Sequence, residues 1–369
     1  MKKRGMLLTA LSLALPAALI LSACSADSPS TEPGDTPSNS TDTLGPKEYA
    51  DDMQALYDAA LENGENTVVV YGAIAGEREK LFDSFTETFP EISVQVEFLT
   101  GATLFSRMNQ EQASGNYVGD ISLTGDDVTV ALGDAGHLEA YLPKATAELA
   151  DEYIGPDGIF AVSTVTPFGV EYNTRDVDEK DVPKSWADLT DPKLQGKMTW
   201  VDLTVSGPSA VVAARLIEHD VIDEEWMKSL TTQDVRWVDK ASALSGVMAT
   251  GEAPIVINTP YDYYLNDLAT GVPAGFRLFD DNNYVAFNSG ALFANAPHPN
   301  AAKLLMSWLY SPQAQESMAA IGQYSPMPGA VAPEDMPALE EVKGIPFTPW
   351  EDLADIGQVG LEMARGVFN

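Results

Sequence analysis

Hydrophobic and polar positions alternate between two patterns from residue 67 onwards. Short β-branched runs indicate buried strands, and stretches with apolar residues three and four apart indicate helices. The pattern predicts strands at Thr67–Tyr71, Ile92–Phe98, Asp120–Leu123, Met198–Val201, Pro254–Asn258 and Tyr284–Phe293. It predicts helices at Tyr49–Leu61, Glu77–Phe89, Thr103–Ala113, from Asp126, Ser209–His219, Asp223–Leu230, Lys240–Thr250, Asn300–Leu309 and Pro312–Ile321. This alternation favours an α/β fold with a parallel sheet covered by helices.

The first 23 residues have the features of an export signal. Lys2–Arg4 form a positive end, and an apolar stretch, Met6–Leu21, precedes small residues. The stretch contains Pro16 and is too short for a membrane span. The sequence Leu21-Ser22-Ala23-Cys24 resembles the lipobox of bacterial lipoproteins. This resemblance implies that Cys24 is acylated and holds the protein on the outer face of a membrane.

Residues 25–48 contain almost only Ser, Thr, Pro, Asp, Gly and Asn. Such a segment lacks apolar side chains to pack and is expected to be a disordered tether that begins at Cys24. As a flexible coil, its 24 residues would span roughly 27 Å. The tether therefore suits a folded body held just above a membrane.

Composition and charge narrow the classes of function. Hydrophobic content is 45% and charged content is 21%, which is typical of a globular protein. The chain has 55 acidic and 21 basic residues, a formal net charge of −34, so a phosphate backbone would be repelled and nucleic acid is not an expected partner. One cysteine excludes a disulfide scaffold and cysteine-ligated metal clusters. No Gly-x-Ser-x-Gly, His-Glu-x-x-His or phosphate-binding Gly-Lys motif is present, which argues against an exported α/β hydrolase.

Several stretches carry a resemblance to a known family. They are the opening strand Thr67–Tyr71, the Trp186-Ala-Asp-Leu-Thr-Asp-Pro-Lys193 turn with Gly196-Lys197, and the late segments Asn295–Ala302 and Ser311–Glu316. Over residues 66–330 the chain resembles the substrate-binding proteins of bacterial ABC importers, in the branch of ferric-ion-binding proteins and their phosphonate, thiamine and polyamine relatives.

The resemblance implies a two-lobed type II periplasmic-binding-protein fold. Lobe 1 would comprise residues 66–162 and 287–330, and lobe 2 residues 163–286, with 331–369 unassigned. The chain would cross between the lobes near Val162–Thr166 and near Tyr284–Phe287. A solute would bind in a cleft between the lobes, where open parallel sheets bind ligands at the carboxyl ends of their strands.

Two loops at such strand ends carry candidate polar residues. Thr124 and Asp126 follow the third strand; either could cap the next helix, and either could face the cleft. Ser206, Gly207 and Ser209 open a later helix, whose N–H groups and dipole would suit an anion or serve only as a capped helix start. Ferric-binding relatives have a histidine after the first strand and a glutamate after the third, and this chain has Ala73 or Ile74 and Gly125 there.

Three tyrosines, Tyr261, Tyr263 and Tyr264, follow the strand ending at Asn258. Ferric-binding relatives use an adjacent tyrosine pair at this strand end, and Tyr263-Tyr264 matches it if two residues are inserted. The resemblance thus implies phenolate ligands for Fe³⁺, because the metal's charge ionises a phenol far below its usual pKa of about 10. An aromatic wall for an organic solute and plain packing remain alternatives.

The expected function is the binding component of an ABC importer, with permease and ATPase subunits as partners. It would act as a monomer without catalysis or a cofactor, and would carry Fe³⁺ with a companion anion as its cargo. A phosphonate, thiamine or polyamine-like solute is the alternative, and an exported hydrolase is the alternative from another class. A surface adhesin would not need two lobes around a cleft.

Overall fold

The computed structural model describes residues 43–74, 76–205, 208–353 and 356–368. The predicted leader, Cys24 and the tether up to residue 42 lie outside the described residues. The end of the predicted tether, residues 43–48, joins the folded part, because Leu44 is buried and the helix α1 (Lys47–Asn63) begins within it. No helix among the described residues is long and apolar enough to cross a membrane.

The described residues form an α/β fold, as predicted. The strands are β1 Thr67–Gly72, β2 Ser93–Phe98, β3 Ile121–Gly125, β4 Leu138–Glu139, β5 Phe160–Asn173, β6 Met198–Val201, β7 Arg236–Val238, β8 Ile255–Pro260, β9 Ala274–Arg277 and β10 Val285–Phe293. The remaining helices are α2 Asp83–Thr88, α3 Gly101–Ser114, α4 Asp126–Asp134, α5 Pro208–Glu218, α6 Glu224–Leu230, α7 Leu244–Ala249, α8 Tyr261–Ala269, α9 Pro299–Trp308, α10 Pro312–Ala320 and α11 Ile356–Phe368.

Most predicted elements agree with the structure to within a few residues. The helix expected over Glu77–Phe89 instead begins as a 3₁₀ segment, η1 (Gly76–Phe82), before α2. The strand expected to end at Asn258 continues to Pro260, and α8 starts at the next residue. The short strands β4, β7 and β9 and the helices α8 and α11 were not predicted, and β5 was predicted only in part, as a crossing near Val162–Thr166.

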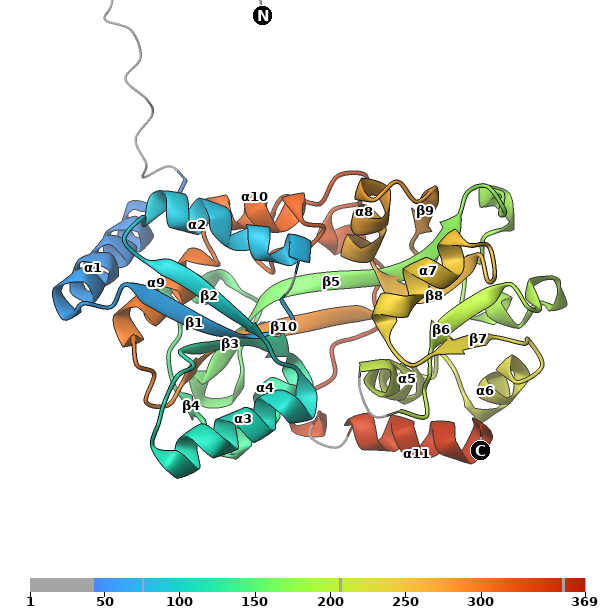
Figure 1. Cartoon of the computed structure of the whole chain (residues 1–369), viewed down its shortest axis with the longest axis horizontal. Helices are drawn as coiled ribbons and strands as arrows, with labels where there is room; N and C mark the ends of the chain where they lie inside the picture. The colour runs from blue at the N-terminus through green and yellow to red at the C-terminus, as the bar shows by residue number, and fades with distance from the viewer. Residues whose placement is uncertain (1–42, 75, 206–207, 354–355, 369) are drawn as a thin grey trace, which may run out of the picture. The chain divides into compact units, whose positions relative to one another are not determined.

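The strands lie in the order β2-β1-β3-β10-β5-β8-β6-β7, with β4 beside β10 and β9 beside β5 (Figure 1). β1 is parallel to β2 and β3, and β6 is parallel to β7 and β8. β10 and β5 are antiparallel to their neighbours in the middle of this order. Two parallel groups are thus separated by a pair of antiparallel strands.

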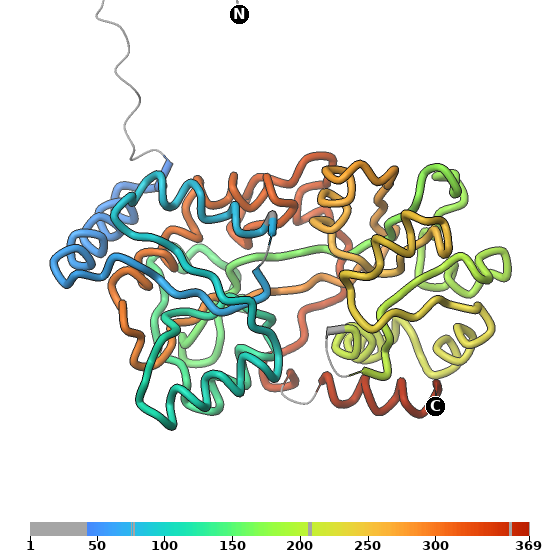
Figure 2. The backbone as a smooth tube through the Cα atoms, in the orientation of Figure 1, coloured from blue at the N-terminus to red at the C-terminus, as the bar shows by residue number. Residues whose placement is uncertain are grey.

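β5 changes its pairing partner halfway along its length. Up to Pro167, which pairs with Val285, it lies beside β10; from Phe168, which pairs with Pro260, it lies beside β8. Figure 2 shows β5 (green) and β10 (orange) running side by side between the two groups of strands. We call β1–β4 with α1–α4, α9 and α10 the first lobe, and β6–β9 with α5–α8 and α11 the second lobe.

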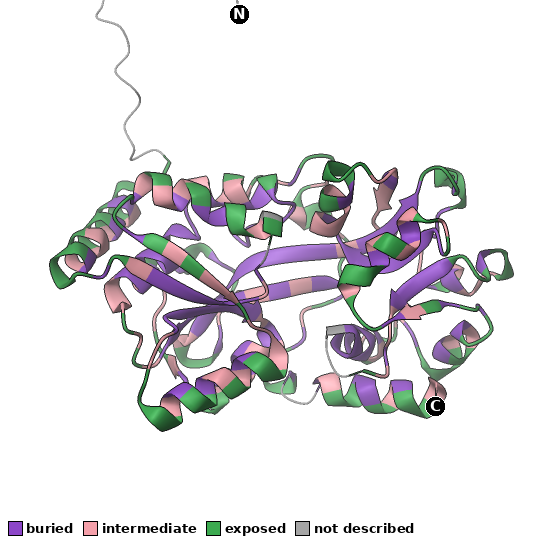
Figure 3. Cartoon of the chain, in the orientation of Figure 1, coloured by how far each residue is buried: buried purple, intermediate pink, exposed green. Residues whose placement is uncertain are grey.

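Each lobe has its own apolar core, and a further cluster joins them. Val70, Phe85 and Leu305 belong to the core of the first lobe, and Trp200 and Ile257 belong to that of the second. The joining cluster is formed by residues of β5, β10, α4, α5 and the segment after α10: Val130, Phe160, Val162, Val165, Val211, Ala214, Val285, Phe287, Ala291, Tyr324, Trp350, Leu353 and Ile356. Figure 3 shows β5 and β10 buried along most of their length.

The chain after residue 330, which the sequence left unassigned, packs at the lobe junction and then on the second lobe. Trp350 and Leu353 enter the joining cluster, and α11 lies along α5. At Gly360 a Cβ atom would lie 2.1 Å from the carbonyl oxygen of Ala210, so a glycine is required for this close approach.

The pattern of β2 overstated the burial of one strand face. Strand alternation puts Ile92, Val94, Val96 and Phe98 on one face, but only Ile92 is buried and Phe98 is 62% exposed. β2 is the end strand of the order, so one of its edges has no neighbouring strand to cover it.

Candidate functional site

The carboxyl ends of the parallel strands meet at the lobe junction. Arg78 lies on η1 after β1, Asp126 opens α4 after β3, Arg215 lies on α5 after β6, and Asp262 lies on α8 after β8. Contacts between these four side chains, described below, join the two lobes. The junction is therefore at the place where the sequence predicted a solute to bind.

Asp126 is buried and bound to an arginine of the opposite lobe. Its Oδ2 accepts a hydrogen bond of 2.6 Å from Nη2 of Arg215, and its Oδ1 accepts one from the N–H of Asp127. It is the first residue of α4, with Gly125 in the cap position. Thr124 is buried within β3, where its backbone pairs with Ser289. Asp126 thus lies at the junction, but its carboxylate is already paired.

Arg215 was missed by the sequence analysis. It is 2% exposed, and its Nε has no hydrogen-bond acceptor. Burial would lower its pKa, but the neighbouring Tyr284 and Asp126 outweigh this effect and raise the pKa above its ordinary value. Burial, and next the charge of Asp126, raises the pKa of Asp127. Two carboxylates, one guanidinium and the Tyr284 phenol therefore share this part of the junction.

Arg78 makes the second ion pair between the lobes. Its Nε donates to Oδ2 of Asp262 at 2.6 Å, and its Nη1 donates to the carbonyl oxygen of Ala73, in the loop after β1. The side chains of Arg78 and Asp262 are 22% and 9% exposed, and Oδ1 of Asp262 is buried without a partner. A cavity of about 420 Å³ opens beside Asp262, with walls from α2, α8 and α10.

The three tyrosines of α8 have different surroundings. The hydroxyl of Tyr261 donates to the carbonyl oxygen of Glu334 at 2.6 Å, and its ring lies 5.5 Å from that of Tyr264. Both rings pack against Phe276. Tyr263 lies near Arg78; burial raises its pKa, and the guanidinium opposes that rise.

Helix geometry explains this separation. Residues three apart share one face of a helix, and Tyr263 is turned away from that face. The adjacent pair Tyr263-Tyr264 suggested by the sequence is therefore split, with Tyr263 beside the ion pair and Tyr264 in an aromatic cluster.

The loop after β6 is only partly described. Ser206 and Gly207 lie outside the described residues. Ser209 is buried, and its Oγ donates to the carbonyl oxygen of Asp202 at 3.1 Å. Ser209 therefore holds the start of α5 to the end of β6. Among the described residues, no group of three or more His, Cys, Asp or Glu side chains is placed to hold a metal ion.

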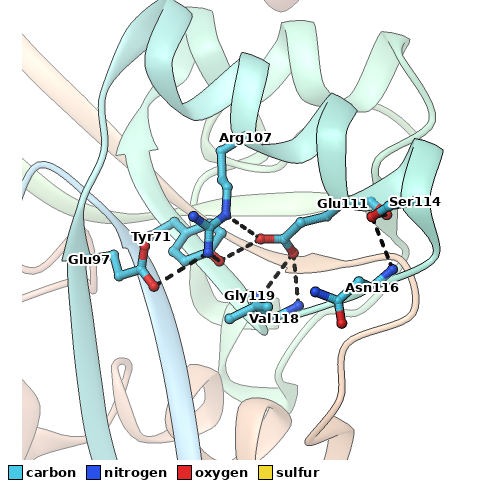
Figure 4. A network of polar contacts seen from close by, with 8 residues as sticks. All are labelled: Tyr71, Glu97, Arg107, Glu111, Ser114, Asn116, Val118 and Gly119. Carbon is cyan, nitrogen blue, oxygen red and sulfur yellow. Dashed lines mark hydrogen bonds and ion pairs between the residues drawn. The ribbon is translucent and has the colours of Figure 1, made fainter.

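A polar network fixes the end of β1 in the first lobe (Figure 4). The hydroxyl of Tyr71 and Nε of Arg107 both donate to Oε1 of Glu111 at 2.6 Å. Oε2 of Glu111 accepts from the N–H groups of Val118 and Gly119, just before β3. A buried carboxylate with four donors holds β1, α3 and the approach to β3 together, so the strand ends that reach the junction are rigidly supported.

The fold and the position of the site define a class of protein. Two parallel groups of strands joined by two antiparallel crossing strands, with polar residues of both lobes meeting at the strand ends, are the fold of type II periplasmic binding proteins. Residues 80–344 match the model of the bacterial extracellular solute-binding protein family, and the chain belongs to this family.

Comparison with individual proteins agrees with this assignment. The chain is 24% identical over 292 residues to the Fe(3+)-binding periplasmic protein of Serratia marcescens, covering 74% of this chain and 82% of that protein. Iron-bound HitA from Pseudomonas aeruginosa superimposes with a TM-score of 0.68 at 22% identity, covering 82% and 99%. The substrate binding protein of an ABC transporter from Agrobacterium tumefaciens gives 0.70 at 18% identity, covering 82% and 94%.

Proposed function

We propose that this protein is the binding component of an ABC importer, which captures a solute between its lobes and delivers it to a permease driven by ATPase subunits. We further propose that the protein acts as a monomer and that Cys24 carries the lipid that anchors it outside the cell membrane. Membership of the solute-binding family supports the first statement. The lipobox-like sequence and the polar segment after it support the anchor.

The observation that carries the proposal is the way the lobes are joined. β5 and β10 pass between them, and the strand ends of both lobes meet at Arg78–Asp262 and Arg215–Asp126. Such an arrangement opens and closes by small changes in the crossing strands. Moving the open–closed balance from 1:99 to 99:1 requires about 5.5 kcal/mol of differential solute affinity, which several charge-assisted contacts to both lobes supply.

For the cargo we propose ferric iron, bound as the ion or as a complex with a companion anion. The Fe(3+)-binding relative supports this assignment, and Tyr263 offers a phenol oxygen at the junction. Within this proposal Tyr263 is the phenolate ligand.

An organic solute is the second candidate. Two observations favour it: two arginines lie at the junction, and the described residues lack a group of three acidic or histidine ligands. A phosphonate would use the arginines, whereas thiamine or a polyamine would use the aromatic rings and the carboxylates.

Ferric nitrilotriacetate added to the purified protein tests the cargo. A visible charge-transfer band is expected in the wild type, with its loss in Tyr263→Phe and its retention in Tyr264→Phe. Tyr264 is a matched control, because its ring is held by Tyr261 and Phe276. Absence of the band in the wild type would remove iron as the cargo, and mass spectrometry of the gently unfolded protein would then identify a retained organic solute.

A further inference from the structure

The two ion pairs at the junction are reciprocal. In one, the arginine comes from the first lobe and the aspartate from the second, as Arg78–Asp262. In the other, the arginine comes from the second lobe and the aspartate from the first, as Arg215–Asp126. Each lobe therefore contributes one positive and one negative group, and both pairs break when the lobes part.

The pairs hold different parts of the junction. Arg78 reaches from η1 to the first turn of α8, beside the loop after β1. Arg215 reaches from α5 to the first residue of α4, and Val211 and Ala214 of the same helix belong to the joining cluster. Two separated contacts resist both a hinge opening and a sliding of one lobe against the other.

Neither pair requires a solute to form. All four carboxylate and guanidinium groups come from the chain itself, with N–O distances of 2.6 Å in both pairs. The arginines therefore supply part of the free energy of closure in advance, and less of it remains for the solute to supply.

We infer that Arg78 and Arg215 are positioning residues for solute capture, which raise solute affinity by holding the lobes together through ion pairs across the junction. They act by shifting the balance between open and closed states toward the closed state. This inference extends the proposed function, because closure around a solute is its mechanical step.

Small-angle scattering of the purified full-length protein without solute tests the inference. Arg78→Gln and Arg215→Gln are expected to increase the radius of gyration, because each leaves an aspartate of the other lobe without its cation. Arg236→Gln is a matched control, since the pair Arg236–Glu252 lies within the second lobe, and no change is expected there. Thermal unfolding checks that each variant is folded.

A charge exchange separates closure from general loss of structure. Arg78→Asp combined with Asp262→Arg restores opposite charges across the junction and is expected to return the radius of gyration to the wild-type value. Because this pair is partly exposed, the exchange does not bury an isolated charge, and it decides the question even if Arg215→Gln does not fold. An unchanged radius in Arg78→Gln, or a failure of the exchanged pair to restore it, would overturn the inference.

Ferric nitrilotriacetate then measures the effect on capture. If iron is the cargo, Arg78→Gln is expected to weaken its binding about tenfold, mainly through faster release, and the exchanged pair to recover the affinity. If the wild type binds no iron, the proposed cargo fails while the scattering result still decides whether the arginines close the lobes.

Discussion

The two ion pairs across the junction have the same chemistry and nearly the same geometry, but they lie in different surroundings. Arg215 and Asp126 have side chains 2% and 6% exposed and lie next to the apolar cluster that joins the lobes. Arg78 is closer to solvent, at 22% exposed, whereas its partner Asp262, at 9%, is nearly as buried as Asp126. A buried ion pair is costly to break on one side only, because the remaining charge stays without water, whereas a more exposed partner is rehydrated.

The Arg215–Asp126 pair therefore contributes mainly to stability, whereas the Arg78–Asp262 pair can respond to ionic strength. Parting the lobes at Arg215 also exposes apolar side chains of the joining cluster, so the Arg215–Asp126 pair and that cluster resist opening together. Parting them at Arg78 hydrates two charged groups, of which Arg78 is already 22% exposed. A change at the Arg78–Asp262 pair is therefore expected to alter the fraction of closed molecules with less loss of stability than a change at Arg215–Asp126.

Arg215→Met is expected to have the largest effect. Asp126 and its neighbour Asp127 would lose their guanidinium while still buried, and the free energy of unfolding should fall by about 3–5 kcal/mol. Urea denaturation followed by tryptophan fluorescence measures this loss. The control Arg236→Met, in an exposed pair, is expected to change stability by less than about 1 kcal/mol. Equal losses of stability in Arg215→Met and Arg236→Met would contradict the statement that a buried ion pair is more costly to break than an exposed one.

The sequence alone predicted most helices and strands and the polar residues at the carboxyl ends of the strands, but it did not predict these ion pairs. Arg78 and Asp262 are 184 residues apart, and Arg215 and Asp126 are 89 apart, so no local pattern connects them. A signal was nevertheless present at Arg215, which follows the apolar run Val211–Ala214 within a predicted helix. A cation in such a position is expected to be buried and paired.

The tyrosines show a second limit of sequence reading. Their density pointed to the strand end after β8, and adjacency in sequence suggested a ligand pair, Tyr263-Tyr264. Once α8 begins at Tyr261, helix periodicity places Tyr261 and Tyr264 on one face and Tyr263 on another. The start of α8 was the missing information, because no helix was predicted after the strand ending at Asn258.

The described residues also include a buried pair of acidic side chains that has no cation, in contrast to the two ion pairs at the junction. Glu171 on β5 and Asp267 on α8 are each 2% exposed, and Oε1 of Glu171 and Oδ2 of Asp267 have no hydrogen-bond donor. Burial, and next the charge of Asp267, raises the pKa of Glu171 to about 9. Here a proton on Glu171 removes one of the two negative charges, whereas at the junction an arginine neutralises the buried aspartate.

Glu171→Gln is expected to have the next largest effect, and in the opposite direction. The folded protein holds a proton on Glu171 that the unfolded chain releases near pH 4.5, so this group costs stability as the pH rises from 4.5 toward 9. Glutamine is neutral throughout and can donate to Asp267, so stability at pH 7 should increase by about 2–3 kcal/mol. Urea denaturation across pH 5–9 should show a flatter profile than the wild type. An unchanged profile would mean that Glu171 is ionised in the folded protein.

Arg78→Met is expected to have the smallest effect on stability, about 1–2 kcal/mol. Asp262 loses its cation while only 9% exposed, but it gains water when the lobes part at this point. Salt provides a second measurement of the same difference. An ion pair near solvent is screened when the ionic strength rises, since the Debye length falls from about 10 Å at 0.1 M to about 3 Å at 1 M, whereas a pair as buried as Arg215–Asp126 is screened much less. The radius of gyration of the wild type should therefore rise with salt, and that of Arg78→Met should not respond, because the screened pair is already absent. If the radius of gyration of Arg78→Met rises with salt as much as that of the wild type, the salt response comes from other charges. The Arg78–Asp262 pair would then be no more sensitive to salt than the Arg215–Asp126 pair.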